Sequence, residues 1–397
     1  MSVVDVNAVL ASVFREEAGR LTASLIRTLG DFYLAEELVQ DAIMVALETW
    51  PKEGVPENPG AWLLTVARNR AVDRLRRDAR YRQKLQQLEL PEAQDPDDRL
   101  SLIFTCCHPA LSREAQVALT LRTVCGMTTT EIGRAFLTSE TTVAQRLVRA
   151  RRKISDACIP YRVPDPDELN DRLHEVLAVL YLMFNEGYLT SAGDKPERRD
   201  LTADAEWLAN LLCKLMPTEP EVLGLLALIQ LHRARAETRF DGEGRLVLLR
   251  DQDRSRWDQR AIAAAADLVV KASRMRHPGP YQIQAAIVAC HAEAPSWEAT
   301  DWLQILLLYD TLEQYSPSPV TALNRAIALS HVRGPQAALD EVDHLQDALG
   351  KYHLYHATRA ELLRELGRAE EARRADEAAL GLTANPAERA LLEQRLS

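Results

Sequence analysis

The helical spacing of apolar residues constrains this chain more than any other feature. Apolar side chains recur three and four positions apart in almost every segment, whereas few segments alternate with the period of two that a half-buried strand requires. The N-terminal run shows the pattern in Val9, Leu10, Val13, Phe14, Leu21, Leu25 and Ile26. Such stripes bury themselves by packing helix on helix. We therefore expect an all-α protein.

Prolines and acidic stretches divide the 397 residues, which are too many for one ordinary core. Turn-rich PKEGVPENPG covers 51–60, acidic LPEAQDPDD covers 90–98, and IPYRVPDPDEL covers 159–169 with three prolines that cannot continue a helix. We expect one small helical domain over 1–88, an acidic linker over 89–110 and a second small helical domain over 111–158. A large helical domain should follow over 170–397.

The C-terminal part contains an internal repeat. The segments NRAIALSHVRGPQAALDEV from Asn324 and ATRAELLRELGRAEEARRA from Ala357 align at a spacing of 33, and each places a glycine between two helical patterns, Gly334 and Gly367. This period is close to the roughly 34 residues of tetratricopeptide repeats, which stack helical hairpins. We expect 170–397 to be such a repeat-like domain.

Charge is distributed unevenly along the chain. Residues 1–160 contain 21 Lys and Arg against 21 Asp and Glu, and the rest contains 27 against 37, so the net charge of -10 belongs to the C-terminal part. Within the neutral part, basic residues cluster at 68–84 and at 146–153. Two such clusters are typical of two contacts with nucleic acid.

The second cluster ends a helix-turn-helix pattern, TTTEIGRAFLTSETTVAQRLVRARRKI, over 128–154. Thr128 can cap a first helix that turns Ile132 and Phe136 inward, and Ser139 can cap a second helix. Val143, Leu147 and Ile154 would face the interior. The outward side chains include types that pair with base edges or phosphates, and we expect DNA contacts from Thr141, Thr142, Gln145, Arg146, Arg149, Arg151 and Arg152. An ordinary helical hairpin with a solvated basic face is the alternative.

The order of motifs resembles the extracytoplasmic-function (ECF) sigma factors, the promoter-recognition subunits of bacterial RNA polymerase within the sigma-70 family. The resemblance is carried by ELVQDAIMVALETW over 37–50, by NPGAWLLTVARNRAVDRLRR over 58–77, and by the helix-turn-helix with the helix before it. It covers about 7–158. It implies a transcription initiation factor that has two small helical domains, the second a helix-turn-helix.

The resemblance also implies roles for particular residues. The β′ clamp of core RNA polymerase would be contacted by Leu38, Val39, Gln40 and Asp41. The opened minus-ten element would lie along Asn58, Arg68, Asn69, Arg70, Arg74, Arg76 and Arg77. The helix-turn-helix would read the minus-thirty-five element. Expected partners are therefore core RNA polymerase, through its β′ clamp and β subunits, and promoter DNA.

The remainder resembles a subgroup of these factors whose core is followed by a long tetratricopeptide-like extension, with segments such as LIFTCCHPAL, YLMFNEGY and GPYQIQAAI. The resemblance implies that the extension regulates activity. The acidic excess beside two basic clusters suggests that it masks the sigma domains, and the alternative is that it is a required part of the assembly. A regulatory protein is a further expected partner. A stand-alone helix-turn-helix regulator with an effector-binding or protein-binding C-terminal domain is the alternative function.

Other motifs favour no chemistry. Cys106, Cys107 and His108 are adjacent, which does not give the spacing that wraps a zinc ion, and packing is the favoured role. No nucleophile elbow or phosphate-binding loop is present. We therefore expect no catalytic residues, metal or cofactor, and no enzyme. Short apolar runs and an N-terminus without a signal pattern favour a cytoplasmic protein without membrane contact.

Overall fold

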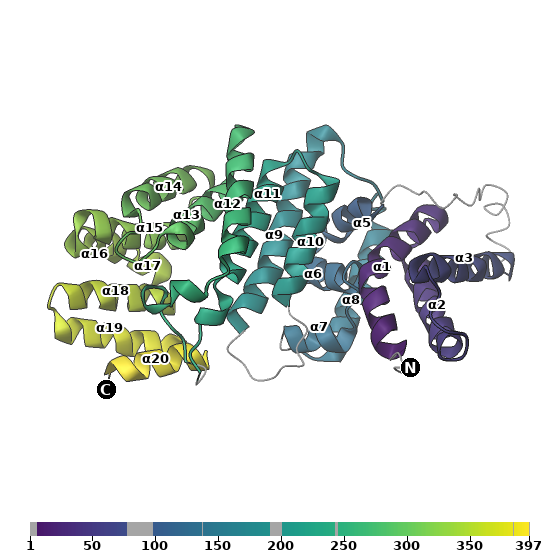
Figure 1. Ribbon diagram of the computed structural model, residues 1–397, viewed down its shortest axis with the longest axis horizontal. Helices are drawn as coiled ribbons and strands as arrows, with labels where there is room; N and C mark the ends of the chain where they lie inside the picture. The colour runs from purple at the N-terminus through teal and green to yellow at the C-terminus, as the bar shows by residue number, and fades with distance from the viewer. Residues whose placement is uncertain are drawn as a thin grey trace. The chain divides into compact units, whose positions relative to one another are not determined.

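The computed structural model of the protein describes residues 6–77, 98–136, 138–190, 201–242, 245–383 and 385–396. Within these ranges the regular structure is helical, apart from one isolated bridge between Phe240 and Leu246 (Figure 1). This confirms the all-α class. No described helix combines the length and apolar character that crossing a bilayer requires.

The chain forms two compact units, the first over 1–187 with 195–204 and the second over 188–194 with 205–397. The helices of the first unit are α1 (Val6–Leu29), α2 (Phe32–Glu53), α3 (Pro59–Arg77), α5 (Arg99–Cys106), α6 (Arg113–Thr123), α7 (Thr129–Ala135), α8 (Glu140–Asp156) and most of α9 (Pro166–Thr190). Helix α10 (Leu201–Leu215) begins in the first unit and ends in the second.

Helix α1 organises the core of the first unit. It contacts α2, α3, α5 and α6, so both predicted sigma domains pack against one helix. The largest fully buried side chains of this unit include Leu25, Trp50, Leu63 and Phe104. Burial of an apolar side chain of this size contributes about 1.5–3 kcal/mol. The two small domains therefore share one core instead of standing apart.

Local signals set the helix ends in this unit. Helix α2 begins after Asp31, whose Oδ1 accepts a hydrogen bond from the Leu34 backbone N–H at 3.0 Å. It ends at Gly54, which has φ +90°, a conformation that costs glycine little. Ser112 caps α6 in the same way as Asp31 caps α2. These caps are sequence features, and they fix where α2 begins and ends and where α6 begins.

The second unit contains α11 (Pro220–Arg233), α12 (Gln259–Arg274), α13 (Pro280–Glu293), α14 (Trp302–Tyr315), α15 (Pro319–Arg333), α16 (Pro335–Asp343), α17 (Gln346–Leu349), α18 (His353–Glu365), α19 (Ala369–Leu382) and α20 (Pro386–Leu396). Short 3-10 helices η2 (Ala236–Thr238), η3 (Leu249–Asp251) and η4 (Arg254–Arg256) join α11 to α12. Consecutive long helices pack on one another from α11 to α16 and from α18 to α20.

The predicted repeat is present as two helical hairpins. Helices α15 and α16 form one, and α18 and α19 form the other. Gly334 and Gly367 both adopt positive φ, +88° and +73°, at the corresponding turns. Left-handed backbone is the reason that glycine recurs at this spacing.

Two features of the described residues bear on the predicted domain bounds, which stay predictions. Residues 78–97, with the first nine residues of the predicted acidic linker, lie outside the described residues, and 99–106 form α5 within the predicted linker. Helix α9, expected to open the C-terminal domain, is bound to the first unit. The Arg172 guanidinium donates to the Phe104 carbonyl at 2.8 Å, and Arg113 pairs with Glu175 at 2.8 Å.

Candidate nucleic-acid interface

The helix-turn-helix forms as predicted over α7 and α8. Thr128 and Glu131 make a reciprocal capping box at the start of α7, and Ser139 Oγ accepts from the Thr142 backbone N–H at 3.1 Å. Ile132, Val143, Leu147 and Ile154 are buried. Gly133 has a steric role, since a Cβ there would lie 2.9 Å from the Thr138 carbonyl oxygen. Close approach of the backbone in the turn therefore sets the angle between the two helices.

One face of α8 is exposed and polar. Thr141, Gln145, Arg149 and Arg152 are exposed, and their spacing of four, four and three residues places them along one side of the helix. Thr142 and Arg146 are half-buried at its edge. The 17-residue helix is about 25 Å long, long enough to lie across a major groove. This side presents both base-pairing and phosphate-pairing groups.

Arg151 does not lie on that face. Its guanidinium pairs with Glu36 of α2 at 2.5 Å, and Glu36 also pairs with Arg122 of α6 at 3.3 Å. The Arg151 and Glu36 side chains are only 16% and 11% exposed. Arg151 lies four positions after Leu147 and three before Ile154, so it continues the inward stripe of α8. Because this apolar stripe is visible in the sequence, it could have predicted that Arg151 faces the interior.

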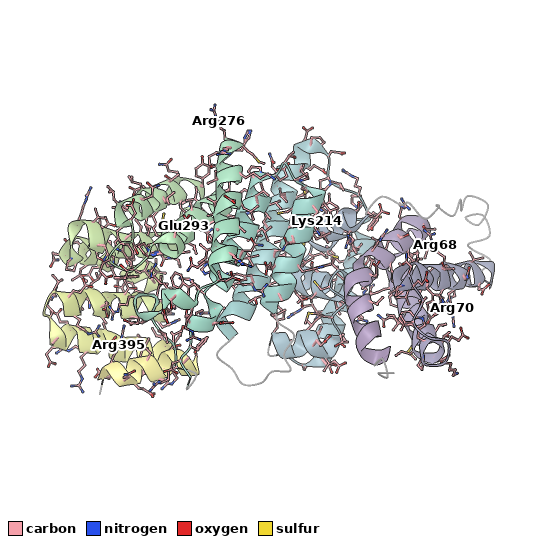
Figure 2. The ribbon with its side chains drawn as sticks, in the orientation of Figure 1. Arg68, Arg70, Lys214, Arg276, Glu293 and Arg395 are labelled. Atoms are coloured by element: carbon pink, nitrogen blue, oxygen red, sulfur yellow. The ribbon has the colours of Figure 1, made fainter. Side chains whose placement is uncertain are left out.

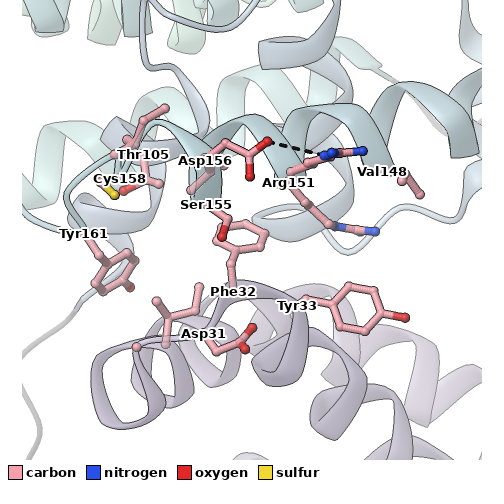
Figure 3. A pocket seen from close by; sticks show the side chains of 15 residues that line it. Asp31, Phe32, Tyr33, Thr105, Val148, Arg151, Ser155, Asp156, Cys158 and Tyr161 are labelled. Atoms are coloured by element: carbon pink, nitrogen blue, oxygen red, sulfur yellow. Dashed lines mark hydrogen bonds and ion pairs between the residues drawn. The ribbon is translucent and has the colours of Figure 1, made fainter.

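A cavity of about 610 Å³ lies beside this ion pair. The N-terminal end of α2 supplies Asp31 and Tyr33, and the C-terminal half of α8 supplies Val148 and Ser155, as Figure 3 shows. Tyr33 and Val148 are 63% and 58% exposed. The two helices are therefore separated by open space here, and the Glu36–Arg151 pair bridges them.

Helix α3 carries the second predicted contact (Figure 2). Asn69 and Arg70 are exposed, whereas Arg68 is half-buried and donates to Ser24 Oγ at 3.4 Å. Arg74 is exposed and pairs with Glu37 at 3.3 Å. The side chains of Arg76 and Arg77 lie outside the described residues.

Asn58 has a structural role at the start of α3. Its Oδ1 accepts from the Ala61 backbone N–H at 3.0 Å, so it caps the helix. The predicted contact between Asn58 and DNA would have to coexist with this cap. Trp62 of α3 packs edge-on against buried Trp50 of α2, with ring centroids 5.5 Å apart, which holds α3 against α2.

The predicted polymerase contact on α2 is only partly at the surface. Leu38 and Val39 are buried in the core, so neither can touch a partner while the helices stay packed. Gln40 and Asp41 are half-buried. The exposed apolar residue of this helix nearest to them is Met44, at 57%. Met44 was not predicted because it lies in the continuous apolar run over 42–47, in which buried and exposed positions carry the same residue types.

Cys106 and Cys107 are packed in the core. Burial, together with the neighbouring Cys107 and Glu36, raises the pKa of the Cys106 thiol. Burial also raises the pKa of Cys107 to about 12, although a hydrogen bond with Thr120 opposes the shift. Both groups are therefore neutral thiols near pH 7. No group of three or more metal-ligating side chains occurs among the residues that the structure describes.

Comparisons with known proteins match these parts separately. Residues 13–81 match the model of sigma-70 region 2, residues 101–154 that of sigma-70 region 4, and residues 172–273 that of a family of unknown function, DUF6596. The ECF RNA polymerase sigma factor SigL of Mycobacterium tuberculosis is 31% identical over 157 residues, which are 37% of this chain and 87% of that protein. "Uncharacterized protein R00370" of Rhizobium meliloti is 44% identical over 387 residues, 94% of this chain and 92% of that protein.

Proposed function

Because the chain belongs to the sigma-70 family of RNA polymerase sigma factors and is of the ECF-like type, we propose that it recognises two promoter elements through α8 and α3. As a sigma factor it acts in transcription initiation, with core polymerase and promoter DNA as partners. We further propose which residues contact the promoter and the polymerase, and what role the second unit has.

The observation that carries the proposal is the exposed face of α8. Gln145 and Arg149 are one turn apart, and the Arg149 Nε–H donates to the Gln145 carbonyl at 3.3 Å, so both lie on one side of the helix. Amide and guanidinium groups pair with adenine and guanine edges in the major groove. Arg152, further along this face, is placed for a phosphate. We assign this face to the minus-thirty-five element.

We assign the minus-ten contact to α3. The exposed side chains of α3 include Asn69, Arg70 and Arg74. Because they recur along the helix, they can contact successive nucleotides of a single DNA strand. The Arg74 and Glu37 side chains are 57% and 37% exposed, so Arg74 can exchange this carboxylate for a phosphate at little cost. Gln40, Asp41 and Met44 on α2 are then the proposed contacts with the polymerase clamp.

We further propose that the second unit regulates this activity. It contains 22 Lys and Arg against 28 Asp and Glu, and its helical hairpins offer the kind of surface that binds proteins. Two outcomes are distinguishable. If residues 1–204 initiate more strongly than the full chain, the second unit inhibits; if only the full chain initiates, it is a required part of the holoenzyme.

The test is transcription in vitro from the protein's own upstream promoter with core polymerase. The full chain is compared with Arg149→Ala and with Arg20→Ala, a matched control at an exposed arginine of α1. We expect initiation that requires core polymerase and is reduced by Arg149→Ala alone. Tight operator binding by the isolated chain, with no polymerase contact, would instead support a stand-alone helix-turn-helix regulator.

A further inference from the structure

Two arginines and several aromatic rings meet inside the second unit. Arg235 follows α11, Arg254 begins η4, and His291 lies near the end of α13. The Arg254 Nη1 group donates to the His291 carbonyl and, at 2.7 Å, to the Ala294 carbonyl. Its guanidinium lies 4.8 Å from the centroid of the Trp257 ring. These contacts fix Arg254 against the end of α13.

Arg235 is held by contacts with the end of α11 and with η2. Its Nη2 lies 3.1 Å from His232 Nδ1, and its carbonyl accepts from the Thr238 hydroxyl at 2.9 Å. Thr238 Oγ1 in turn accepts from Trp257 Nε1 at 2.8 Å. A chain of hydrogen bonds thus joins the Arg235 segment to the ring on which Arg254 rests.

Three nitrogen atoms of this cluster have no hydrogen-bond partner among the residues that the structure describes. They are buried, and they are Nε of Arg235, Nη2 of Arg254 and Nδ1 of His291. Buried polar groups in folded proteins are almost always paired. Three unpaired nitrogens on neighbouring side chains therefore indicate a site for a ligand with hydrogen-bonding atoms.

The charge of the cluster indicates the kind of ligand. Neither guanidinium forms an ion pair with a carboxylate of the described chain, and an arginine cannot lose its proton to escape burial. The pKa of His291 is lowered to about 3, mainly by burial and further by the charges of Arg235, Arg254 and His331. Its imidazole is therefore neutral. Burial lowers the pKa of Arg254, and the negative charge of exposed Glu298 opposes this shift from the surface. The cluster thus presents two fixed positive charges beside a neutral ring.

We propose that Arg235, Arg254 and His291 bind a small oxyanion, a carboxylate or phosphate group, through these three nitrogens. Guanidinium N–H groups match the geometry of both anions, and a neutral imidazole can complete the set. Trp302 stands 5.1 Å from His291, centroid to centroid, and stacks on His331 at 3.7 Å. These rings form an aromatic wall beside the site. The site gives the second unit a ligand, and it does not depend on the sigma-factor assignment.

The test uses the full chain with inorganic phosphate or succinate, against sodium chloride at equal ionic strength. Tryptophan fluorescence and thermal unfolding are both followed, because three of the six tryptophans line or adjoin the cluster. We expect a saturable fluorescence change and a rise in Tm of about 2–4 °C near saturation. A response to phosphate alone or to succinate alone identifies the group bound. No difference from chloride with either anion overturns the proposal.

Variants locate the response. Arg235→Gln and Arg254→Gln should abolish it, whereas Arg260→Gln, at an exposed arginine of α12, should retain it. If Arg254→Gln does not fold, because it loses two backbone contacts, Arg235→Gln carries the test. A saturable response retained by Arg235→Gln contradicts the proposal.

Discussion

Two neighbouring carboxylates of α2 pair with the two arginine-rich helices in different ways. Glu36 is buried and pairs with Arg151 of α8 at 2.5 Å, whereas Glu37 is half-buried and pairs with exposed Arg74 of α3 at 3.3 Å. The residue types are the same, and the difference lies in burial. A buried carboxylate between two arginines is part of the core, whereas a more exposed pair can give way to a phosphate. Arginine content alone therefore does not identify a DNA contact.

The largest expected effect is on stability, from Glu36→Gln. The substitution leaves Arg122 and Arg151 charged, buried and without a counter-charge, so the free energy of unfolding should fall by about 3–5 kcal/mol. Denaturant unfolding of the full chain measures it. Glu37→Gln is the matched control, and equal losses in the two variants would show that the difference in burial has no energetic consequence.

Arg149→Ala should affect DNA binding and not folding. Loss of a base-edge contact costs about 1–3 kcal/mol, so holoenzyme affinity for the promoter should fall between about fivefold and 150-fold. Arg152→Ala should weaken binding less. It should reduce the slope of the logarithm of the binding constant against the logarithm of salt concentration by about one. Arg151→Ala should instead lower the unfolding midpoint. An unstable Arg149→Ala or a stable Arg151→Ala would contradict the assignment of inner and outer faces.

The reactivity of the buried thiols shows whether solvent and reagents can reach the core around Glu36. Because burial raises the pKa values of Cys106 and Cys107, the latter to about 12, both should stay protonated and unreactive toward alkylating reagents at pH 8. Exposed Cys158 should react first. Mass spectrometry of peptides measures the three rates. We expect Glu36→Gln to increase the rate at Cys106 at least several-fold, and fast alkylation of native Cys106 would contradict the closed core.

The smallest effect is expected from the Glu37–Arg74 pair. Glu37→Gln should change the free energy of unfolding by less than about 1 kcal/mol, and the change should shrink as salt is raised. It releases Arg74 from its carboxylate, so promoter binding should be unchanged or slightly tighter. Weaker binding would mean that Glu37 positions Arg74 for DNA instead of competing with it.

Much of the molecule could be predicted from local sequence. The all-α class, the caps at Thr128 and Ser139, the inward residues of α8 and the glycines of the repeat depend on neighbours within one or two turns. The placement of Leu38, Val39 and Arg151 could not be predicted from local sequence, because it depends on what packs against each helix. Arg151 has basic neighbours in the sequence, although it continues the apolar stripe of α8.

The sequence by itself determined where the helices begin and end and which stripe of each is apolar, because capping and periodicity are local. Only the tertiary structure decided that Glu36 meets Arg122 and Arg151, that α9 packs with the first unit, and that Arg254 meets His291, 37 positions away. Those contacts depend on how whole helices are placed, and many placements satisfy the same apolar stripes. The fate of a charged side chain, buried ion pair or open contact, is therefore set by packing.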